Sequence, residues 1–204
     1  MVERQLRARG IDDERVLAAM RRVPRELFVP EAERMHAYDD VALPIGYEQT
    51  ISQPYMVALI CSLLSLHGKE KVLDVGTGSG YQAAVLSRLA REVVSVERYR
   101  TLAETARTRL KTLGYDNVDV RLGDGLLGVP ERAPFDRIIV TAAAETIPEA
   151  LVNQLADGVM ILPLGPHGGV QRLVKVTKGE GATQEEELIG VRFVPLLPGQ
   201  AREL

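Results

Sequence analysis

The residues best suited to chemistry form a glycine-rich stretch that directly follows an apolar, β-branched run. Residues 72–80 read Val-Leu-Asp-Val-Gly-Thr-Gly-Ser-Gly, and a helical pattern begins at Gln82. This order predicts a strand, a tight turn and a helix N-terminus, the unit that opens a doubly wound α/β fold. Gly76, Gly78 and Gly80 leave the backbone open to a ligand and permit positive φ angles. The stretch therefore predicts a nucleotide-like cofactor at a strand-to-helix turn.

The spacing of these glycines distinguishes two classes of cofactor. Dinucleotide folds use Gly-x-Gly-x-x-Gly and place a pyrophosphate on the helix N-terminus, but Tyr81 stands where that pattern has its third glycine. Gly-x-Gly-x-Gly after Val-Leu-Asp-Val instead resembles the first motif of S-adenosylmethionine-dependent methyltransferases. The carboxylate of Asp74, with no Lys or Arg nearby, suits a cationic amino-acid ligand better than a phosphate. We therefore expect S-adenosylmethionine to be bound by Asp74, Gly76, Thr77, Gly78, Ser79 and Gly80.

Two further acids stand where the next predicted strands end. Glu97 follows Gly76 by about 20 residues, the distance at which a carboxylate accepts hydrogen bonds from ribose hydroxyls. Asp124, within Gly123-Asp-Gly, is placed to receive the adenine amino group. A strand-capping acid and a plain Asp-Gly turn are the alternatives. Because carboxyl ends of parallel strands meet at one edge, we expect a shared cofactor site that includes Glu97, Arg98, Asp124 and Gly125.

The pattern from residue 53 onward alternates strands with helices. Pro54 is expected to open a helix that runs to about Leu66. The expected strands are 71–75, 93–97, 118–122, 135–141 and 159–163, and the helices between them are 81–90, 99–112 and one near Pro148. Residues 171–178 and 187–194 predict a closing β pair around a Lys178-Gly-Glu-Gly turn. The result is a Rossmann-like α/β fold, with a doubly wound, mostly parallel sheet and an antiparallel edge.

The N-terminal quarter predicts a different kind of structure. Residues 2–9 and 13–22 have the pattern of two short amphipathic helices, with Asp12 or Asp13 as an N-cap. Residues 36–52 show no period and predict an ordered loop. We expect a single domain over 1–204, in which 1–52 form a helical extension and substrate loop. Residues 53–204 then form the cofactor-binding core and the C-terminal β pair.

Composition limits the partners and the compartment. A chain of 204 residues with 46% hydrophobic and 26% charged residues is an ordinary globular protein, and its net charge of −3 provides no basic footprint for nucleic acid. The single cysteine, Cys61, excludes an internal disulfide and fits a reducing compartment. No apolar run is long enough to span a membrane, and the charged N-terminus does not resemble a signal peptide. The expectation is a cytoplasmic protein without membrane or nucleic-acid partners; the oligomeric state is not determined, and a monomer is favoured.

A set of motifs that begins upstream of the glycine-rich stretch and continues beyond it resembles the protein-L-isoaspartate O-methyltransferase family. The resemblance is carried, in family order, by Ile45-Gly46, Gln49-Thr-Ile-Ser-Gln-Pro54, the glycine-rich loop, Gly123-Asp-Gly125, Phe135-Asp136, Leu162-Pro-Leu-Gly165 and Phe193-Val-Pro-Leu196. These motifs span nearly the whole chain. The sequence departs from the family at Glu48, where many members have Gly, and at Leu197, where some have Thr.

The resemblance implies methyl transfer from S-adenosylmethionine to the free α-carboxylate of L-isoaspartyl residues in proteins and peptides. It implies that Ser52 is the active-site hydroxyl and that substrate is bound by Thr50, Ile51, Gln53 and Pro54. From the residues alone, a Ser ahead of a helix-opening Pro is more often a cap. That helix N-terminus would favour an anion such as the substrate carboxylate. No metal-ligand cluster is expected.

The sequence leaves two alternative functions open beside isoaspartyl methylation. One is a methyltransferase for bases or small molecules, although Thr141-Ala-Ala-Ala replaces the Asn/Asp-Pro-Pro-aromatic segment common in amino-methylating enzymes. Cys61, in an apolar helical stretch, is a poor nucleophile for cytosine C5 chemistry. The other is a non-catalytic module that kept the cofactor pocket. The presence of the Thr50–Pro54 segment favours an enzyme over such a module, because a protein that only binds the cofactor has no evident need of Ser52.

Overall fold

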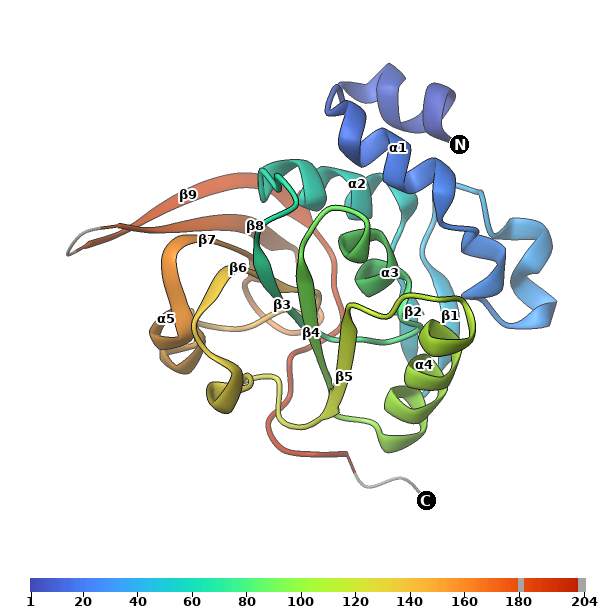
Figure 1. The fold of residues 1–204 in the computed structure, drawn as a ribbon. Coiled ribbons are helices and arrows are strands. Elements are labelled where there is room, and N and C mark those ends of the chain that lie inside the picture. The colour runs from blue at the N-terminus through green and yellow to red at the C-terminus, as the bar shows by residue number, and fades with distance from the viewer. Residues whose placement is uncertain (180–181, 202–204) are drawn as a thin grey trace.

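A seven-stranded sheet forms the centre of the molecule (Figure 1). The computed structural model describes residues 1–179 and 182–201. Across the sheet the order is β5 (Val118–Leu122), β4 (Glu92–Glu97), β3 (Lys71–Val75), β6 (Phe135–Val140), β7 (Leu155–Leu164), β8 (Gln171–Gly179) and β9 (Ala182–Val191). The first five strands are parallel, and β8 and β9 add an antiparallel edge. The predicted fold class is confirmed.

Alternating side chains of the central strands supply two hydrophobic cores, one on each face of the sheet. Val72 and Val93 belong to one core, whereas Leu73 and Val94 belong to the other. Such continuous apolar strands are typical of parallel sheets that are covered on both sides. The first core is covered by α1 (Glu14–Arg22), α2 (Pro54–Leu63), α3 (Tyr81–Ser87) and α4 (Arg100–Thr112), and the second by α5 (Glu149–Gln154). This arrangement leaves the carboxyl ends of β3, β4 and β6 free to form a site.

The two short helices predicted over 2–9 and 13–22 are both helical in the structure, but only the second is an α-helix. Val2–Leu6 form a π-helical turn and Arg7–Arg9 a 3₁₀ turn, which ends at Gly10 with φ +88°. Burial of Val2 and Leu6 holds this short segment where its own propensity is too weak for an α-helix. The second prediction is confirmed by α1, whose N-cap Asp13 accepts hydrogen bonds from two backbone amides. Further 3₁₀ turns are Arg25–Leu27, Glu31–His36 and Pro130–Arg132.

The predicted loop over 36–52 contains a β-hairpin, so that prediction is wrong in part. β1 (Leu43–Gly46) pairs antiparallel with β2 (Gln49–Ile51), and the buried Leu43 faces Ile51. Pro44 and Gly46 hide the strand pattern in the sequence, while burial of the two apolar residues stabilises the pairing. Glu48, at the turn, has φ +57°, a conformation that Gly adopts without strain. The Gly that many members of the resembled family have at this position would fit the same conformation.

The last strand is also shifted relative to the prediction. β9 covers Ala182–Val191 rather than 187–194, because its first half is an exposed edge with the polar run Thr183-Gln-Glu-Glu-Glu. Such a run lacks the apolar alternation of a half-buried strand but protects a sheet edge from pairing with other chains. Part of the predicted turn, residues 180–181, lies outside the described residues. In Figure 1 this hairpin extends away from the body of the molecule.

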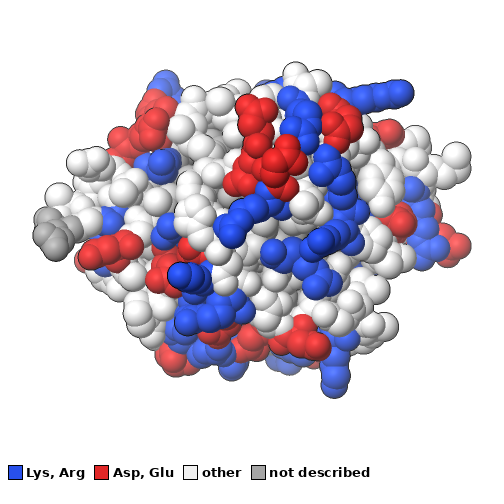
Figure 2. All heavy atoms as spheres, turned by 45° about the horizontal axis from the view of Figure 1, so that its top comes forward, with Lys and Arg blue, Asp and Glu red and all other residues white. Residues whose placement is uncertain are grey.

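The face that carries the N-terminal helices has basic and acidic side chains interspersed (Figure 2). Arg7 pairs with Glu3 and Glu14, and Arg9 pairs with Asp40. Arg7 and Arg9 are therefore neutralised locally by neighbouring carboxylates. Within residues 1–179 and 182–201, no helix is long and apolar enough to cross a membrane.

Candidate active site

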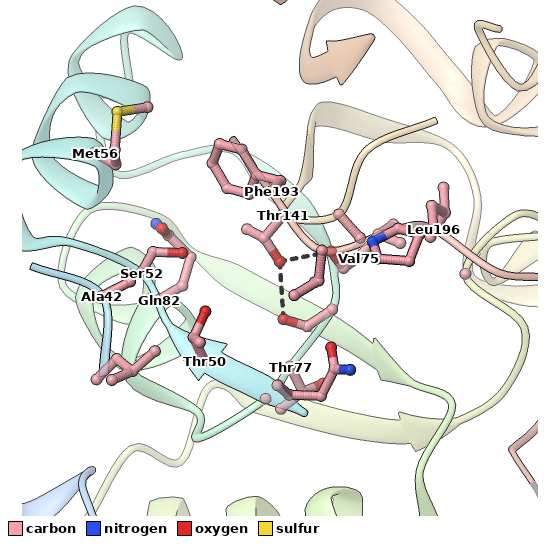
Figure 3. Close-up of a pocket in the computed structure, with 18 of the residues that line it drawn as sticks. Ala42, Thr50, Ser52, Met56, Val75, Thr77, Gln82, Thr141, Phe193 and Leu196 are labelled. Carbon is pink, nitrogen blue, oxygen red and sulfur yellow. Dashed lines mark hydrogen bonds between the residues drawn. The ribbon is translucent and has the colours of Figure 1, made fainter. Parts of the chain in front are cut away.

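A cavity of about 880 Å³ opens at the carboxyl ends of β3, β4 and β6. Most of the residues predicted for the cofactor and the substrate lie on its wall: Thr50, Ile51, Ser52, Gln53, Gly76, Thr77, Gly78, Ser79, Glu97, Arg98 and Gly125. Figure 3 shows Thr50 and Ser52 on one side, Thr141 and Phe193 on the other, and Thr77 below Thr141. The structure thus brings the glycine-rich loop and the upstream Thr50–Gln53 segment into one space.

The glycine-rich loop is held tightly against the strand ends. The Gly76 amide donates to the Val96 carbonyl at 2.9 Å, and Gly76 has φ +101°. A Cβ at Gly76 would lie 2.5 Å from the Thr141 Oγ1 atom, so any larger residue would displace the Thr141 side chain. The single proton of that hydroxyl is shared between the carbonyls of Val75 and Gly76, each 3.0 Å away (Figure 3). The loop therefore requires glycine for both its conformation and its packing.

Glu97 joins the loop to the next strand. Its carboxylate accepts hydrogen bonds from the Gly78 amide at 2.8 Å and from the Arg98 and Tyr99 amides at 2.8 and 3.0 Å. The residue is 6% exposed, and it lies on the cavity wall. Oε1 accepts both the Arg98 and the Tyr99 amide, whereas Oε2 accepts only the Gly78 amide, so one lone pair on Oε2 is left for a hydroxyl of a ligand. This geometry fits the predicted ribose contact.

Asp74 lies behind the cavity wall rather than on it. Asp74 and Ser95 are register partners on β3 and β4, and the Ser95 hydroxyl donates to Asp74 Oδ2 at 2.7 Å. Thr77 Oγ1 lies 2.6 Å from the same hydroxyl, and Asp74 Oδ1 has no partner among the described residues. This chain of hydrogen bonds connects the buried carboxyl group to Thr77, which does line the cavity. Asp74 thus supports the loop from below.

Burial raises the pKa of Asp74 to about 7, and the negative charge of Glu97 adds to the rise, which the Ser95 hydrogen bond opposes. Between the unfolded pKa, about 4, and this value, the folded protein holds a proton that the unfolded chain has lost. Raising the pH from 5 to 7 is therefore expected to lower the free energy of unfolding of the wild type, relative to Asp74→Asn, by about 2 kcal/mol. Urea unfolding of both proteins at both pH values measures this difference. If the wild type and Asp74→Asn differed in free energy of unfolding by the same amount at pH 5 and pH 7, the raised pKa of a buried Asp74 carboxyl would be contradicted.

Three other predicted contacts do not reach the cavity wall. Asp124 accepts hydrogen bonds from the Leu126 and Gly199 amides at 2.9 and 2.7 Å, so its carboxylate anchors a turn and the C-terminal segment. A Cβ at Gly80 would lie 3.3 Å from Leu110, which shows that this glycine permits close packing of α4. Pro54 is buried at the start of α2. All three residues shape the surroundings of the cavity from these positions.

Ser52 lies between the end of β2 and the start of α2. The residue is half-buried on the cavity wall, and no protein group in the described part of the chain hydrogen-bonds its hydroxyl. None of the three histidines belongs to the wall, so no imidazole stands beside this hydroxyl. A hydroxyl with free donor and acceptor capacity can orient an incoming carboxylate.

The sequence did not reveal the second wall of the cavity. This wall contains Thr141, Arg192, Phe193, Val194, Pro195, Leu196 and Leu197. The backbone of Ala143 bonds to Val194 and Leu196 at 2.7 and 2.8 Å, which brings the C-terminal segment across the end of β6. The Phe193-Val-Pro-Leu196 motif, one of those that carry the family resemblance, was the sequence signal for this wall. Its position in the sequence did not indicate that it would line the cavity.

The fold and the glycine-lined cavity are those of S-adenosylmethionine-dependent methyltransferases. Residues 1–201 match the family described as protein-L-isoaspartate(D-aspartate) O-methyltransferase. A protein-L-isoaspartate O-methyltransferase from Nitrobacter winogradskyi is 56% identical over 205 residues, covering 100% of this chain and 94% of the relative. One from Xanthobacter autotrophicus is 56% identical over 98% of this chain and 91% of its own length. The chain therefore belongs to the protein-L-isoaspartate O-methyltransferase family.

Solved structures agree with this assignment. A protein-L-isoaspartate O-methyltransferase aligns with a TM-score of 0.88 and 31% identity, over 98% of this chain and 67% of that chain. A Plasmodium falciparum protein of the same description, solved with S-adenosyl-L-homocysteine, aligns with a TM-score of 0.81 and 30% identity over 96% of both chains.

Proposed function

We propose that this protein transfers the methyl group of S-adenosylmethionine to the free α-carboxylate of L-isoaspartyl residues in damaged proteins and peptides. The observation that carries the proposal is the shared cavity, whose wall holds both the Gly76–Ser79 loop and the Thr50–Gln53 segment. The resulting methyl ester cyclises to a succinimide without the enzyme, and hydrolysis of the succinimide regenerates some normal aspartate. The reaction thus begins the repair of isomerised aspartyl residues.

The cofactor end of the cavity is formed by the loop and by Glu97. When bound, S-adenosylmethionine supplies an electrophilic methyl group on a sulfonium centre. Glu97 Oε2 would accept a ribose hydroxyl, while Gly76 and Gly78 would let the backbone approach the ligand closely. Arg98 and Gly125 line the adjoining wall, where they flank the adenine. Asp74 acts through Thr77 and fixes the loop in place.

At the other end of the cavity, Ser52 orients the nucleophile. An α-carboxylate with a reference pKa of about 3.5 is ionised at pH 7, so it attacks without a general base. The Ser52 hydroxyl donates a hydrogen bond to one carboxylate oxygen and leaves the other directed at the methyl carbon. Ile51, Phe193 and Leu196 line the same space and displace water from the charged nucleophile. Alignment and desolvation then supply the rate enhancement.

Under this proposal the two parts of the single domain have different tasks. Residues 1–52 supply the hairpin and the segment that contacts the substrate, and residues 53–204 supply the cofactor-binding core and the C-terminal β pair. The cavity wall draws on both parts, with Ser52 from the first and Glu97 from the second.

The geometry gives little support to cytosine C5 methylation. Burial raises the pKa of the Cys61 thiol to about 12, so the thiol is protonated at neutral pH. Cys61 also lies outside the cavity wall, packed in the first hydrophobic core. It is therefore unsuited to act as the nucleophile that cytosine C5 methylation needs.

A pair of matched peptides tests the proposed substrate. One peptide contains a single L-isoaspartyl residue and the other contains normal aspartate at the same position. We expect transfer of labelled methyl from S-adenosylmethionine to the isoaspartyl peptide only. Label on both peptides, or on neither, would contradict the proposed specificity.

A further inference from the structure

Asp40 lies behind the segment that carries Ser52 and accepts hydrogen bonds from both sides of the Gln53–Pro54 junction. The Gln53 side-chain amide donates to Asp40 Oδ2 at 2.8 Å and to the Asp40 carbonyl at 2.9 Å. The Tyr55 backbone amide donates to Asp40 Oδ1 at 3.1 Å. Asp40 itself is not on the cavity wall. Its contacts therefore act on the backbone that follows Ser52, without reaching a ligand.

Arg9 connects the same carboxylate to the N-terminal segment. Its guanidinium lies 2.5 Å from Asp40 Oδ2 and 3.5 Å from the centroid of the Tyr55 ring. The Asp40 side chain is 22% exposed in this ion pair, so the contact is partly shielded from solvent. Three segments distant in sequence thus meet at Asp40: the 3₁₀ turn of Arg9, the loop before β1, and the start of α2.

These contacts also alter the electrostatics at the N-terminus of α2. Pro54 has no N–H group, the Tyr55 amide is taken by Asp40, and the Val57 amide donates to the Gln53 carbonyl at 3.2 Å. The carboxylate of Asp40 therefore already occupies the position at which a helix N-terminus favours an anion. Among the described residues, the Met56 amide is the one N–H of this first turn without a protein acceptor, so the helix end can offer a single N–H to the substrate carboxylate. The orientation of the substrate then depends more heavily on the Ser52 hydroxyl.

We propose that Asp40 is a positioning residue for methyl transfer. By holding the Gln53 side chain and the Tyr55 amide, it sets the direction in which the chain leaves β2 and enters α2. The Ser52 hydroxyl lies at that corner, one residue before the contact. Gln53 contributes to this corner through its side chain, and the residue also belongs to the cavity wall. The assignment rests on the proposed function, because its effect is measured on isoaspartyl transfer.

The test is a comparison of Asp40→Ala and Asp40→Asn with the wild type. We expect Asp40→Ala to lower kcat/KM for an isoaspartyl peptide by about 30-fold, since small displacements of an orienting group cost one to two orders of magnitude. Asp40→Asn keeps an acceptor for the Tyr55 amide and should recover part of the loss. The Kd for S-adenosylhomocysteine should stay within about twofold in both variants, which also reports that the cofactor half is folded. Asp39→Asn, whose carboxylate contacts His36 on the surface, is the matched control and should behave as the wild type.

A double-mutant cycle separates positioning from a general loss of stability. If Asp40 acts through Gln53, the double variant Asp40→Ala/Gln53→Ala should lose little more activity than Asp40→Ala alone. Turnover by Asp40→Ala within twofold of the wild type would overturn the role, as would fully additive losses in the cycle. If Asp40→Ala does not fold, Asp40→Asn carries the test by the same criterion. A wild type that fails to methylate the peptide would overturn the proposed function and this role with it, whereas an active wild type with an equally active Asp40→Ala overturns this role alone.

Discussion

Replacement of Ser52 by alanine is expected to lower kcat/KM for an isoaspartyl peptide by about 10- to 100-fold. This range corresponds to the loss of one hydrogen bond to a charged group, about 1.5–3 kcal/mol. The hydroxyl has no partner within the described part of the protein, so its removal leaves no protein group unsatisfied. The effect should therefore fall on substrate orientation and leave the fold intact.

The measurement combines steady-state kinetics with calorimetry. The Kd for S-adenosylmethionine should remain within about twofold of the wild type, because Ser52 and Glu97 lie at opposite ends of the cavity in this account. Ser62→Ala is a matched control, since this serine lies on α2 and its hydroxyl bonds to the Ala58 carbonyl. Equal turnover of the wild type and Ser52→Ala would disprove the assigned role.

Replacement of Glu97 by alanine should have the opposite signature. It removes the proposed ribose contact and also leaves the Gly78, Arg98 and Tyr99 amides without their acceptor. Loss of charge-assisted hydrogen bonds at a site that is 6% exposed is expected to raise the Kd for S-adenosylmethionine by about 100-fold. At saturating cofactor, the rate of methyl transfer should recover a large part of its wild-type value.

Two related variants make this test specific. Glu97→Gln keeps one acceptor oxygen and should weaken binding less than Glu97→Ala. Glu92→Ala removes an acid from the other end of the same strand, where it pairs with Arg132, and should leave cofactor affinity unchanged. An unchanged Kd in Glu97→Ala would rule out the ribose contact.

The strand-end residues could be predicted because their local patterns are strong. An apolar run followed by Asp74 and three alternating glycines predicts a strand and a turn, and the structure places β3 at Lys71–Val75. Glu97 could be predicted for the same reason, since it ends an equally apolar strand at the same sheet edge. The sequence could not show that the Asp74 side chain lies behind the cavity wall, under the glycine-rich loop, instead of facing the ligand. That outcome follows from its register with Ser95 across the two strands.

The features that escaped prediction depend on contacts between distant segments. The hairpin of β1 and β2 depends on Leu43 facing Ile51, and its strand pattern is broken by Pro44 and Gly46. The second cavity wall depends on Ala143 pairing with Pro195. Neither pairing has a periodic signature in the sequence. Both supply surfaces that complete the site.

The central claim is that the α-carboxylate of an isoaspartyl residue receives the methyl group. Its most direct test is to follow one isoaspartyl peptide by mass spectrometry during incubation with the wild type and S-adenosylmethionine. The account predicts a single added methyl group that maps to the isoaspartyl residue, followed by its loss and the appearance of the succinimide and the normal aspartyl peptide. A methyl group that maps to any other residue, or no methylation at all, would contradict it.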